Sequence, residues 1–474
     1  PMTRLQLGML FHGEASASAA VYHDVFSFRL ALEWDEPSFR AALAALVARH
    51  PVLRSSFDLQ VATGPQQKIH PRAEIPLATE DLSAIGEAAA EAVIAAAIAA
   101  EKARPFDVAR PPLLRLMVHR RGPADLQITL GFHHAILDGW SVAAMQVELM
   151  QAWRQVRAGQ RPDATPLACT PALAAAAEQA ALQSDRARTF WAALLEGAEV
   201  LRLPPPLAGP AGTPRRVQLR PGSGVQAGLQ ALADALGLPL RSLLLAAHMR
   251  MLALWAGATD VTTGLVTHTR PEARDSEKVL GLFLNTLPIR LRLGSESWRD
   301  LARATFRAEL DLAAHRHYPL AQIVEENGHV PPFDVIFNFI HFHVYDALQG
   351  AKGTDGAPAL RDMTAFEATN FALGVNAVLG LQGLQVDFAF DPARLDADLV
   401  ERMADSYGAI LQAMLADPDA CHQAALPIPV ADLAQLDHWN RTGKQYAAGG
   451  LTLTQIIETR IALEGDRTAL RFGG

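Results

Sequence analysis

Residues 126–153 place a strand pattern directly before a helix pattern, with room for only a short turn between them. Apolar and polar residues alternate in Leu126–Phe132, which is typical of a half-buried β-strand. Asp138 and Gly139 predict a turn. Ser141 then opens a segment with apolar residues at helical spacing, namely Val142, Met145, Leu149 and Trp153. A strand, turn and helix in this order favour a mixed α/β fold.

Helix and strand patterns continue to alternate up to about residue 425. Phe39–His50 predicts a further helix, because its apolar residues recur at helical spacing. Two stretches rich in proline and polar or small residues, Ala158–Pro166 and Pro204–Pro214, interrupt the alternation. We therefore expect an N-terminal lobe at 1–165, a C-terminal lobe at 166–425, a linker at 426–450 and a short final segment at 451–474.

The composition is that of a globular protein with an ample core. Of the 474 residues 50% are hydrophobic and 19% are charged, which excludes a disordered chain. The net charge of −8 provides no basic field for nucleic acid or an anionic membrane. The most apolar helical stretch, Leu243–Ala258, carries His248 and Arg250 in its middle, so we expect no membrane span. Cys169 and Cys421 match no metal or redox spacing, which favours a reduced, cytoplasmic setting.

The residues best suited to chemistry lie in the turn after the strand pattern, where His133 and His134 precede Asp138 and Gly139. If the strand extends that far, His134 shares the face of Phe132 and points toward an apolar interior, whereas His133 points the other way. A histidine at a strand end can act as a general base near neutral pH. The alternative from the residues alone is a core histidine without a catalytic role.

His133-His134-x-x-x-Asp138-Gly139 resembles the signature of condensation domains of non-ribosomal peptide synthetases, which are related to chloramphenicol acetyltransferase. Further segments resemble other motifs of that family, in the same order, within residues 1–425. These segments are Arg4–His12, Arg49–Phe57, Arg104–Asp107 with Pro112–Arg115, Gly281–Pro288, Tyr318–Ala321 and Phe333–Asn338. Thr267–Pro271 departs from the small-Gly-Arg-Pro pattern that is common in the family.

The resemblance implies two chloramphenicol acetyltransferase-like α/β lobes, arranged as a V-shaped pseudo-dimer with a central tunnel. A donor acyl group would enter on the phosphopantetheine of an upstream peptidyl carrier protein, and an aminoacyl acceptor would enter on a downstream carrier. The chain would need no cofactor of its own. His341-x-His343 could bind a metal, but no carboxylate or cysteine lies at a matching spacing, so we expect no metal site.

The resemblance also assigns roles to residues of the turn. His134 matches the histidine that positions or deprotonates the attacking amine, or that stabilises the tetrahedral intermediate. Asp138 would be structural and held by an arginine, for which Arg54 and Arg290 are the candidates.

Other residues would support this centre. The resemblance makes His133 and Gly139 supporting residues, with Gly139 allowing close backbone approach. We add their neighbours Trp140 and Ser141. Asn285 would line the tunnel, hold the lobe interface or simply be a turn asparagine.

Amide-bond formation by a condensation domain is the function that the resemblance favours. The alternatives are an epimerisation domain, a non-catalytic domain that docks other enzymes, and a free-standing acyltransferase. The intact histidine pair argues against the docking domain. Leu436–Asn440, Leu451–Leu453 and Asp466–Leu470 resemble the start of an adenylation domain, which argues against the other two. The donor is left open among a fatty acyl group, an L-terminated peptide and a D-terminated peptide.

Overall fold

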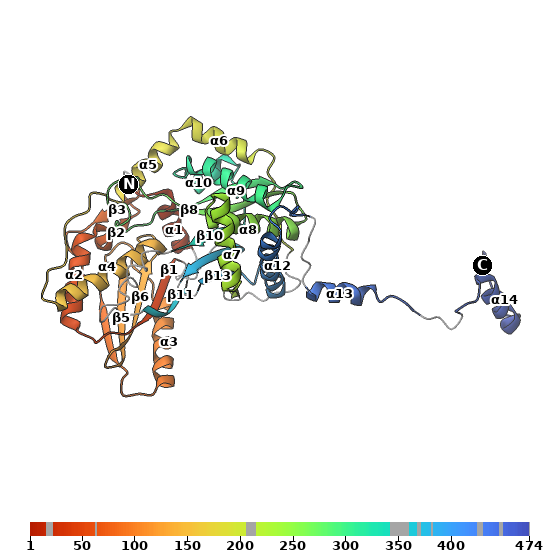
Figure 1. Cartoon of the computed structure of the whole chain (residues 1–474), viewed down its shortest axis with the longest axis horizontal. Coiled ribbons are helices and arrows are strands. Elements are labelled where there is room, and N and C mark those ends of the chain that lie inside the picture. Colours follow the sequence, from red (N-terminus) through yellow and green to blue (C-terminus); the bar gives the residue numbers. More distant parts are fainter. Residues whose placement is uncertain are drawn as a thin grey trace. The chain divides into compact units, whose positions relative to one another are not determined.

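The computed structural model describes residues 1–15, 22–61, 64–204, 215–341, 360–366, 371–380, 383–423, 430–444 and 449–473. Two compact units divide the chain, Pro1–Leu426 and Pro427–Gly474. The larger unit contains two main β-sheets, each packed against helices (Figure 1). It is therefore a mixed α/β structure, as the sequence predicts.

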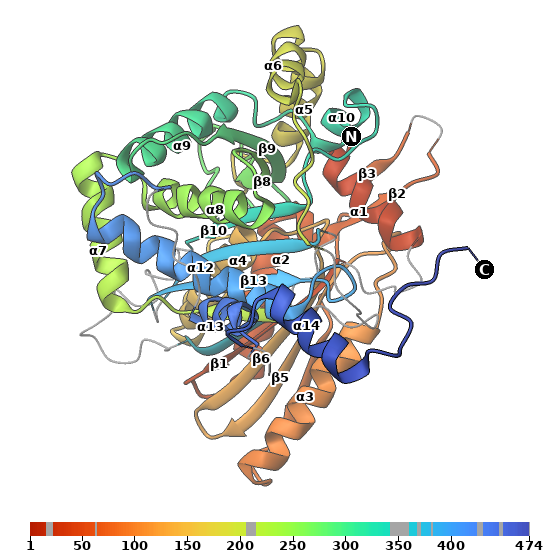
Figure 2. The ribbon, with the colours of Figure 1, turned by 90° about the vertical axis from the view of Figure 1, so that its right-hand side faces the viewer.

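The first sheet has five strands in the order β11-β1-β6-β5-β4. The strands are β1 (His23–Leu30), β4 (Leu77–Asp81), β5 (Leu114–Gly122), β6 (Asp125–His133) and β11 (Leu360–Phe366). Its apolar face packs with α2 (Glu36–Arg49) and α4 (Gly139–Arg157) in one core. Helix α3 (Glu87–Ala103) contacts β1, β5 and β6 from the other side (Figure 2). A small hairpin of β2 (Ser55–Asp58) and β3 (Gln66–Ile69) follows a 3₁₀ turn at Pro51–Arg54.

The local predictions for this sheet are confirmed. Strand β6 covers the predicted strand, and α4 buries Val142, Met145, Leu149 and Trp153. Helix α2 begins earlier than the predicted Phe39, because Asp35 caps it by accepting a hydrogen bond from the backbone N–H of Ser38 at 3.2 Å.

The second sheet has six strands in the order β7-β13-β12-β10-β8-β9. The strands are β7 (Arg215–Leu219), β8 (Asp260–His268), β9 (Leu284–Arg292), β10 (Val335–Ile340), β12 (Leu373–Gly380) and β13 (Gly383–Phe390). Among the described residues, the helices of this part are α5 (Ala172–Leu182), α6 (Asp185–Leu195), α7 (Ser223–Leu236), α8 (Leu240–Ala256), α9 (Trp298–Ala313), α10 (Leu320–Glu326) and α12 (Ala397–Ala416). Helix α8 is buried along most of its length and anchors the core of this sheet.

Within the described residues, no single helix is long and apolar enough to cross a membrane. Helices α7 and α8 are long and apolar enough to cross a membrane only when they are taken together, and the chain bends by 108° between them.

Strand β1 and helix α1 each contact a part of the chain that the sequence assigns to the other lobe. Strand β11 lies in the range expected for the C-terminal lobe, yet it pairs antiparallel with β1 in the first sheet. The buried Glu178 of α5 accepts a 2.8 Å hydrogen bond from the backbone N–H of Arg4, at the start of α1 (Arg4–Ala15). A strand from the range expected for the C-terminal lobe thus completes the first sheet, and a helix-terminal contact joins α5 to α1.

Burial raises the pKa of Glu178 to about 7. The folded protein therefore binds this proton more tightly than the unfolded chain does, and Glu178 lowers stability as the pH rises from about 4.5 to 7. Glu178→Gln keeps an oxygen acceptor for Arg4 and removes the buried charge. We expect it to raise the free energy of unfolding by roughly 1–3 kcal/mol at pH 8 and to change it little at pH 4.

Urea denaturation at the two pH values measures this effect, with the exposed Glu325→Gln as the matched control. Equal stability of Glu178→Gln and wild type at pH 8 would contradict the burial cost assigned to Glu178.

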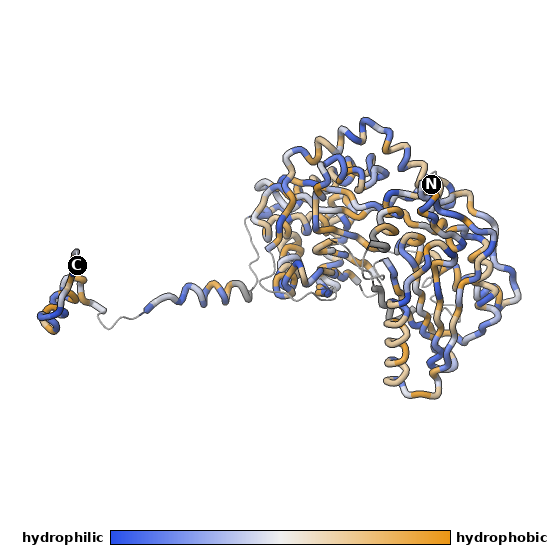
Figure 3. The backbone as a smooth tube through the Cα atoms, turned by 180° about the vertical axis from the view of Figure 1, so that it is seen from behind, coloured by the Kyte–Doolittle hydropathy of each residue, from blue (hydrophilic) through white to orange (hydrophobic). Residues whose placement is uncertain are grey.

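Where the structure describes the smaller unit, it forms the helices α13 (Val430–Asn440) and α14 (Leu453–Glu464). Helix α13 lies inside the range expected to be a linker, and Figure 3 shows apolar and polar residues interleaved along it. Helix α14 begins with a capping box between Thr452 and Gln455. Residues 465–473, which follow α14, form no strand.

Candidate active site

The turn that carries the two histidines is fixed by the strands on both sides of it. Strand β6 ends at His133, whose backbone N–H donates to the carbonyl oxygen of Leu113 at 3.0 Å. The N–H of His134 donates to the carbonyl oxygen of Tyr22 at 2.8 Å. The His134 ring lies beside Phe132, with ring centroids 6.5 Å apart. Its side chain is nevertheless 17% exposed. The ring thus lies on the side of Phe132 and is only partly exposed, although the strand itself ends at His133.

His133 is the more buried member of the pair. Its Nδ1 accepts a hydrogen bond from the backbone N–H of Ala135 at 3.1 Å. Burial, helped by the neighbouring His134, lowers the pKa of His133 to about 4. At neutral pH His133 is therefore uncharged, with its proton on Nε2, and it stiffens the turn that presents His134.

A carboxylate that the sequence analysis did not single out faces His134. Nδ1 of His134 lies 2.7 Å from Oδ2 of Asp24, whose side chain is only 5% exposed. The neighbouring His23 is also buried, and its Nε2 lies 3.2 Å from Oε1 of Glu101. Arg115 donates to the same Glu101 oxygen at 2.7 Å. The polar residues at this end of β1 thus form two separate groups, one around His134 and one around Glu101.

Asp138 forms the N-cap of α4. Its Oδ1 accepts from the backbone N–H of Ser141 at 2.7 Å, and its Oδ2 accepts from the backbone N–H of Phe283 at 3.0 Å. The guanidinium of Arg270 donates to Oδ1 at 3.3 Å. Asp138 therefore ties the start of α4 to the segment that precedes β9.

The expectation that Arg54 or Arg290 holds Asp138 is wrong. Arg54 donates to the carbonyl oxygens of Val47 and His70, which fixes the 3₁₀ turn. Arg290 forms a two-pronged ion pair with Asp260 across the β8–β9 hairpin, at 2.8 and 2.7 Å. Both arginines use their guanidinium N–H groups on these other partners, and residue types alone do not reveal which partner an arginine has. Arg270 belongs to Thr267–Pro271, the segment that departs from the family pattern.

Ser141 and Trp140 add further hydrogen bonds between the start of α4 and the segment that precedes β9. Ser141 Oγ donates to the carbonyl oxygen of Gly281 at 2.8 Å and accepts from Arg270 at the same distance. Trp140 Nε1 donates to the carbonyl oxygen of Glu277 at 3.2 Å. Arg270 also donates to the carbonyl oxygens of residues 276 and 279. The first turn of α4, which begins at Gly139, is therefore bound to residues 270–283 by side chains of both segments.

Asn285 lies in strand β9 and not in a turn. Its Nδ2 donates to the carbonyl oxygens of Arg316 and Tyr318 at 3.0 and 2.7 Å, and its Oδ1 accepts from the N–H of Leu320 at 3.3 Å. These bonds fix the loop before α10, a helix that contacts α1. The turn interpretation is wrong, and the contacts favour a role in holding the two parts together.

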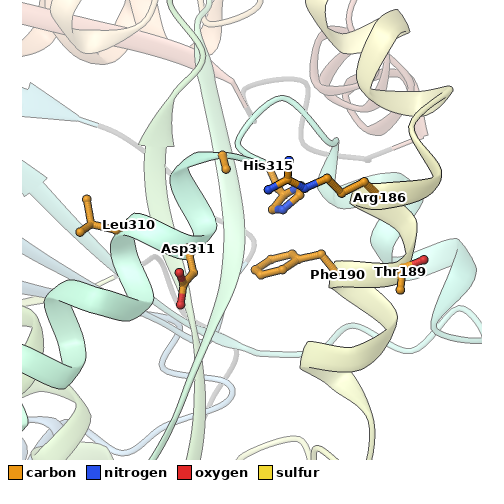
Figure 4. Close-up of a pocket in the computed structure, with 7 residues that line it drawn as sticks. Arg186, Thr189, Phe190, Leu310, Asp311 and His315 are labelled. Atoms are coloured by element: carbon orange, nitrogen blue, oxygen red, sulfur yellow. The ribbon is translucent and has the colours of Figure 1, made fainter.

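Two other features do not join this site. A cavity of about 530 Å³ between α6 and α9 is lined by Phe190, His315 and neighbouring residues, none of which belongs to the predicted site (Figure 4). Across the described ranges, no group of three or more His, Cys, Asp or Glu residues is arranged to hold a metal ion. His341 follows the end of β10, and His343 lies outside the described residues.

Comparison with known proteins agrees with the motif resemblance. The family model described as Condensation domain matches residues 1–431. The chain is 35% identical over 430 residues to the AMB antimetabolite synthetase AmbE of Pseudomonas aeruginosa, covering 88% of this chain and 20% of that protein. It is 29% identical over 336 residues to the chondramide synthase cmdD of Chondromyces crocatus, covering 69% of this chain and 8% of that protein. The chain thus spans a fifth or less of the length of these two relatives.

Solved structures show the same fold. The first condensation domain of the calcium-dependent antibiotic synthetase, in complex with a substrate analogue, matches with a TM-score of 0.74 at 23% identity. The match covers 90% of this chain and 99% of that structure. The X-domain from teicoplanin biosynthesis also matches with a TM-score of 0.74 and 23% identity, covering 90% and 97% of the two chains.

Proposed function

Because the chain belongs to the condensation-domain family of non-ribosomal peptide synthetases, we propose that it joins a carrier-bound donor acyl or peptidyl thioester to a carrier-bound aminoacyl acceptor. The observation that carries this proposal is the presentation of His134. Its ring is partly exposed at the end of β6, next to the buried Asp24 and beside the neutral His133. A docking domain without chemistry has no use for an accessible imidazole held in this way.

The chemistry needs only residues of this chain. The acceptor amine attacks the donor carbonyl carbon, a C–N bond forms and the C–S bond breaks. The proton that leaves the amine passes to His134 and then to the departing thiolate. The thioester is already activated, so no cofactor is required. An α-amino group with a pKa of about 7.7–8.0 is partly deprotonated at neutral pH, so positioning of the amine contributes alongside proton removal.

We also propose how the substrates reach His134 and what adjoins this domain. The phosphopantetheine arms of an upstream and a downstream carrier protein would reach His134 through a tunnel between the lobes expected at 1–165 and 166–425. The segment at 451–474 would begin an adjacent adenylation domain, after the linker range 426–450. We place the assembly in the cytoplasm, in keeping with the unpaired Cys169 and Cys421.

A carrier-to-carrier assay tests the proposal. One carrier is loaded with an acyl, L-aminoacyl or D-aminoacyl donor, the other is loaded with an amino acid, and intact-protein mass spectrometry follows both. We expect the acceptor carrier to gain the mass of the donor group. Failure with every donor, together with exchange of the α-hydrogen of a tethered residue, would indicate epimerisation. Failure in both reactions would favour a docking role.

A further inference from the structure

Asp24 and His134 are brought together by strand register. Asp24 lies in β1 directly opposite Phe132 of β6, and Tyr22 accepts the backbone hydrogen bond of His134. Residues that face each other across an antiparallel pair share one side of the sheet, as do residues two positions apart along a strand. Asp24 and His134 are therefore diagonal neighbours on the same side. The backbone of two paired strands sets the 2.7 Å approach of their side chains.

We infer that Asp24 is a positioning residue for His134, whose carboxylate keeps the imidazole proton on Nδ1 and assigns Nε2 to the acceptor amine. This inference rests on the proposed function and names a residue for which the motif resemblance gives no role. A carboxylate in this position fixes the ring orientation and stabilises the imidazolium that forms when the amine loses its proton.

The charges around Asp24 support this pairing. Glu101, the other buried carboxylate nearby, is paired with Arg115 at 2.7 Å and lies 3.2 Å from His23. Burial lowers the pKa of Lys102 on α3, and the negative charge of Asp24 opposes that shift. The low pKa of His133 leaves that ring neutral. Among the described residues named here, His134 and Lys102 offer positive charge to Asp24, and His134 is the one that lies in the predicted reaction centre.

The contact between Asp24 and His134 is an ion-pair contact. The two atoms are within ion-pair distance, but neither the His134 nitrogen nor the Asp24 oxygen has the alignment of a hydrogen bond. Catalytic hydrogen bonds are often poorly aligned in the absence of substrate and tighten in the complex. A small rotation of the imidazole, driven by an arriving amine, would align the pair without moving the strands.

Asp24→Asn tests the role with little change in shape. An amide can present its NH₂ group to Nδ1 and thereby favour the wrong tautomer of His134. We expect kcat for transfer between loaded carriers to fall by about 10- to 100-fold, with KM for the acceptor carrier nearly unchanged. The acid limb of the pH profile should move to lower pH, because the imidazolium loses its anionic partner. Asp24→Glu should recover part of kcat.

Asp125→Asn is the matched control, because Asp125 pairs with Arg29 at the opposite end of the same two strands. It should leave kcat and the pH profile unchanged. If the wild type transfers the donor and Asp24→Asn has the same kcat and pH profile, the inference about Asp24 is overturned while the proposed function stands. Absence of transfer by wild type would overturn the proposed function and the inference with it.

A second measurement needs no variant at position 24. Nitrogen NMR of the histidine-labelled wild-type chain, with the His134 signals identified by their loss in His134→Ala, reports which ring nitrogen carries the proton. We expect the neutral ring to be protonated on Nδ1. A neutral ring protonated on Nε2 would overturn the inference even if Asp24→Asn failed to fold.

Discussion

His134→Ala is expected to slow donor transfer between loaded carriers by roughly 10²- to 10⁴-fold while leaving a folded protein. The side chain is partly exposed, so its removal opens no large cavity in the core. It does remove the group proposed to orient the amine and to carry its proton. Single-turnover transfer, quenched at set times and read by intact-protein mass spectrometry, measures the effect.

The control for this variant is His438→Ala, an exposed histidine at the end of α13. It should transfer at the wild-type rate. A folded His134→Ala variant with a rate within threefold of wild type would contradict a role for His134 in the reaction. Catalysis would then consist only of positioning the two carriers.

Arg270→Ala is expected to cost about 3–5 kcal/mol of unfolding free energy, the range typical of a broken buried ion pair. The side chain of Asp138 is 2% exposed, and Arg270 is the cation that faces it. The same guanidinium donates to Ser141 and to two backbone carbonyls of the 270–283 segment. Arg270→Lys should recover little, because one ammonium cannot reproduce this spread of donors.

Urea unfolding measures the loss, with Arg292→Ala as the control. Arg292 also pairs with an aspartate, Asp260, but its side chain is 74% exposed, so its loss should cost less than about 1 kcal/mol. A loss below about 1 kcal/mol for Arg270→Ala would contradict the view that this ion pair fastens α4 to the second sheet.

Local pattern in the sequence accounts well for the elements around the site. Periodicity predicts β6 and α4 because each has one buried face, and the N-cap position of Asp138 follows from its place before an apolar helix. Local periodicity does not indicate which strands far apart in the sequence pair with each other. Nothing in the alternation of residues 360–366 shows that β11 joins the sheet of β1, some 330 residues earlier in the chain.

The partners of the motif residues were missed for the same physical reason. Arg54, Arg270 and Arg290 are equivalent as charges, and only the fold decides which of them reaches Asp138. The sequence contains one weak indication that Asp24 has a partner, because this carboxylate lies on the face of β1 that otherwise buries Phe26 and Phe28. A charged residue at such a position is costly unless it has a partner, which is a reason to search for one.

The single-turnover rate of transfer between two loaded carriers, measured with and without the wild-type chain, shows directly whether this domain catalyses amide-bond formation. Spontaneous aminolysis between carriers in solution sets the reference. We expect the wild-type chain to raise the rate by several orders of magnitude. We also expect most of this gain to disappear in His134→Ala. Equal rates with and without the wild-type chain, across acyl, L- and D-donors, would contradict the proposed catalysis.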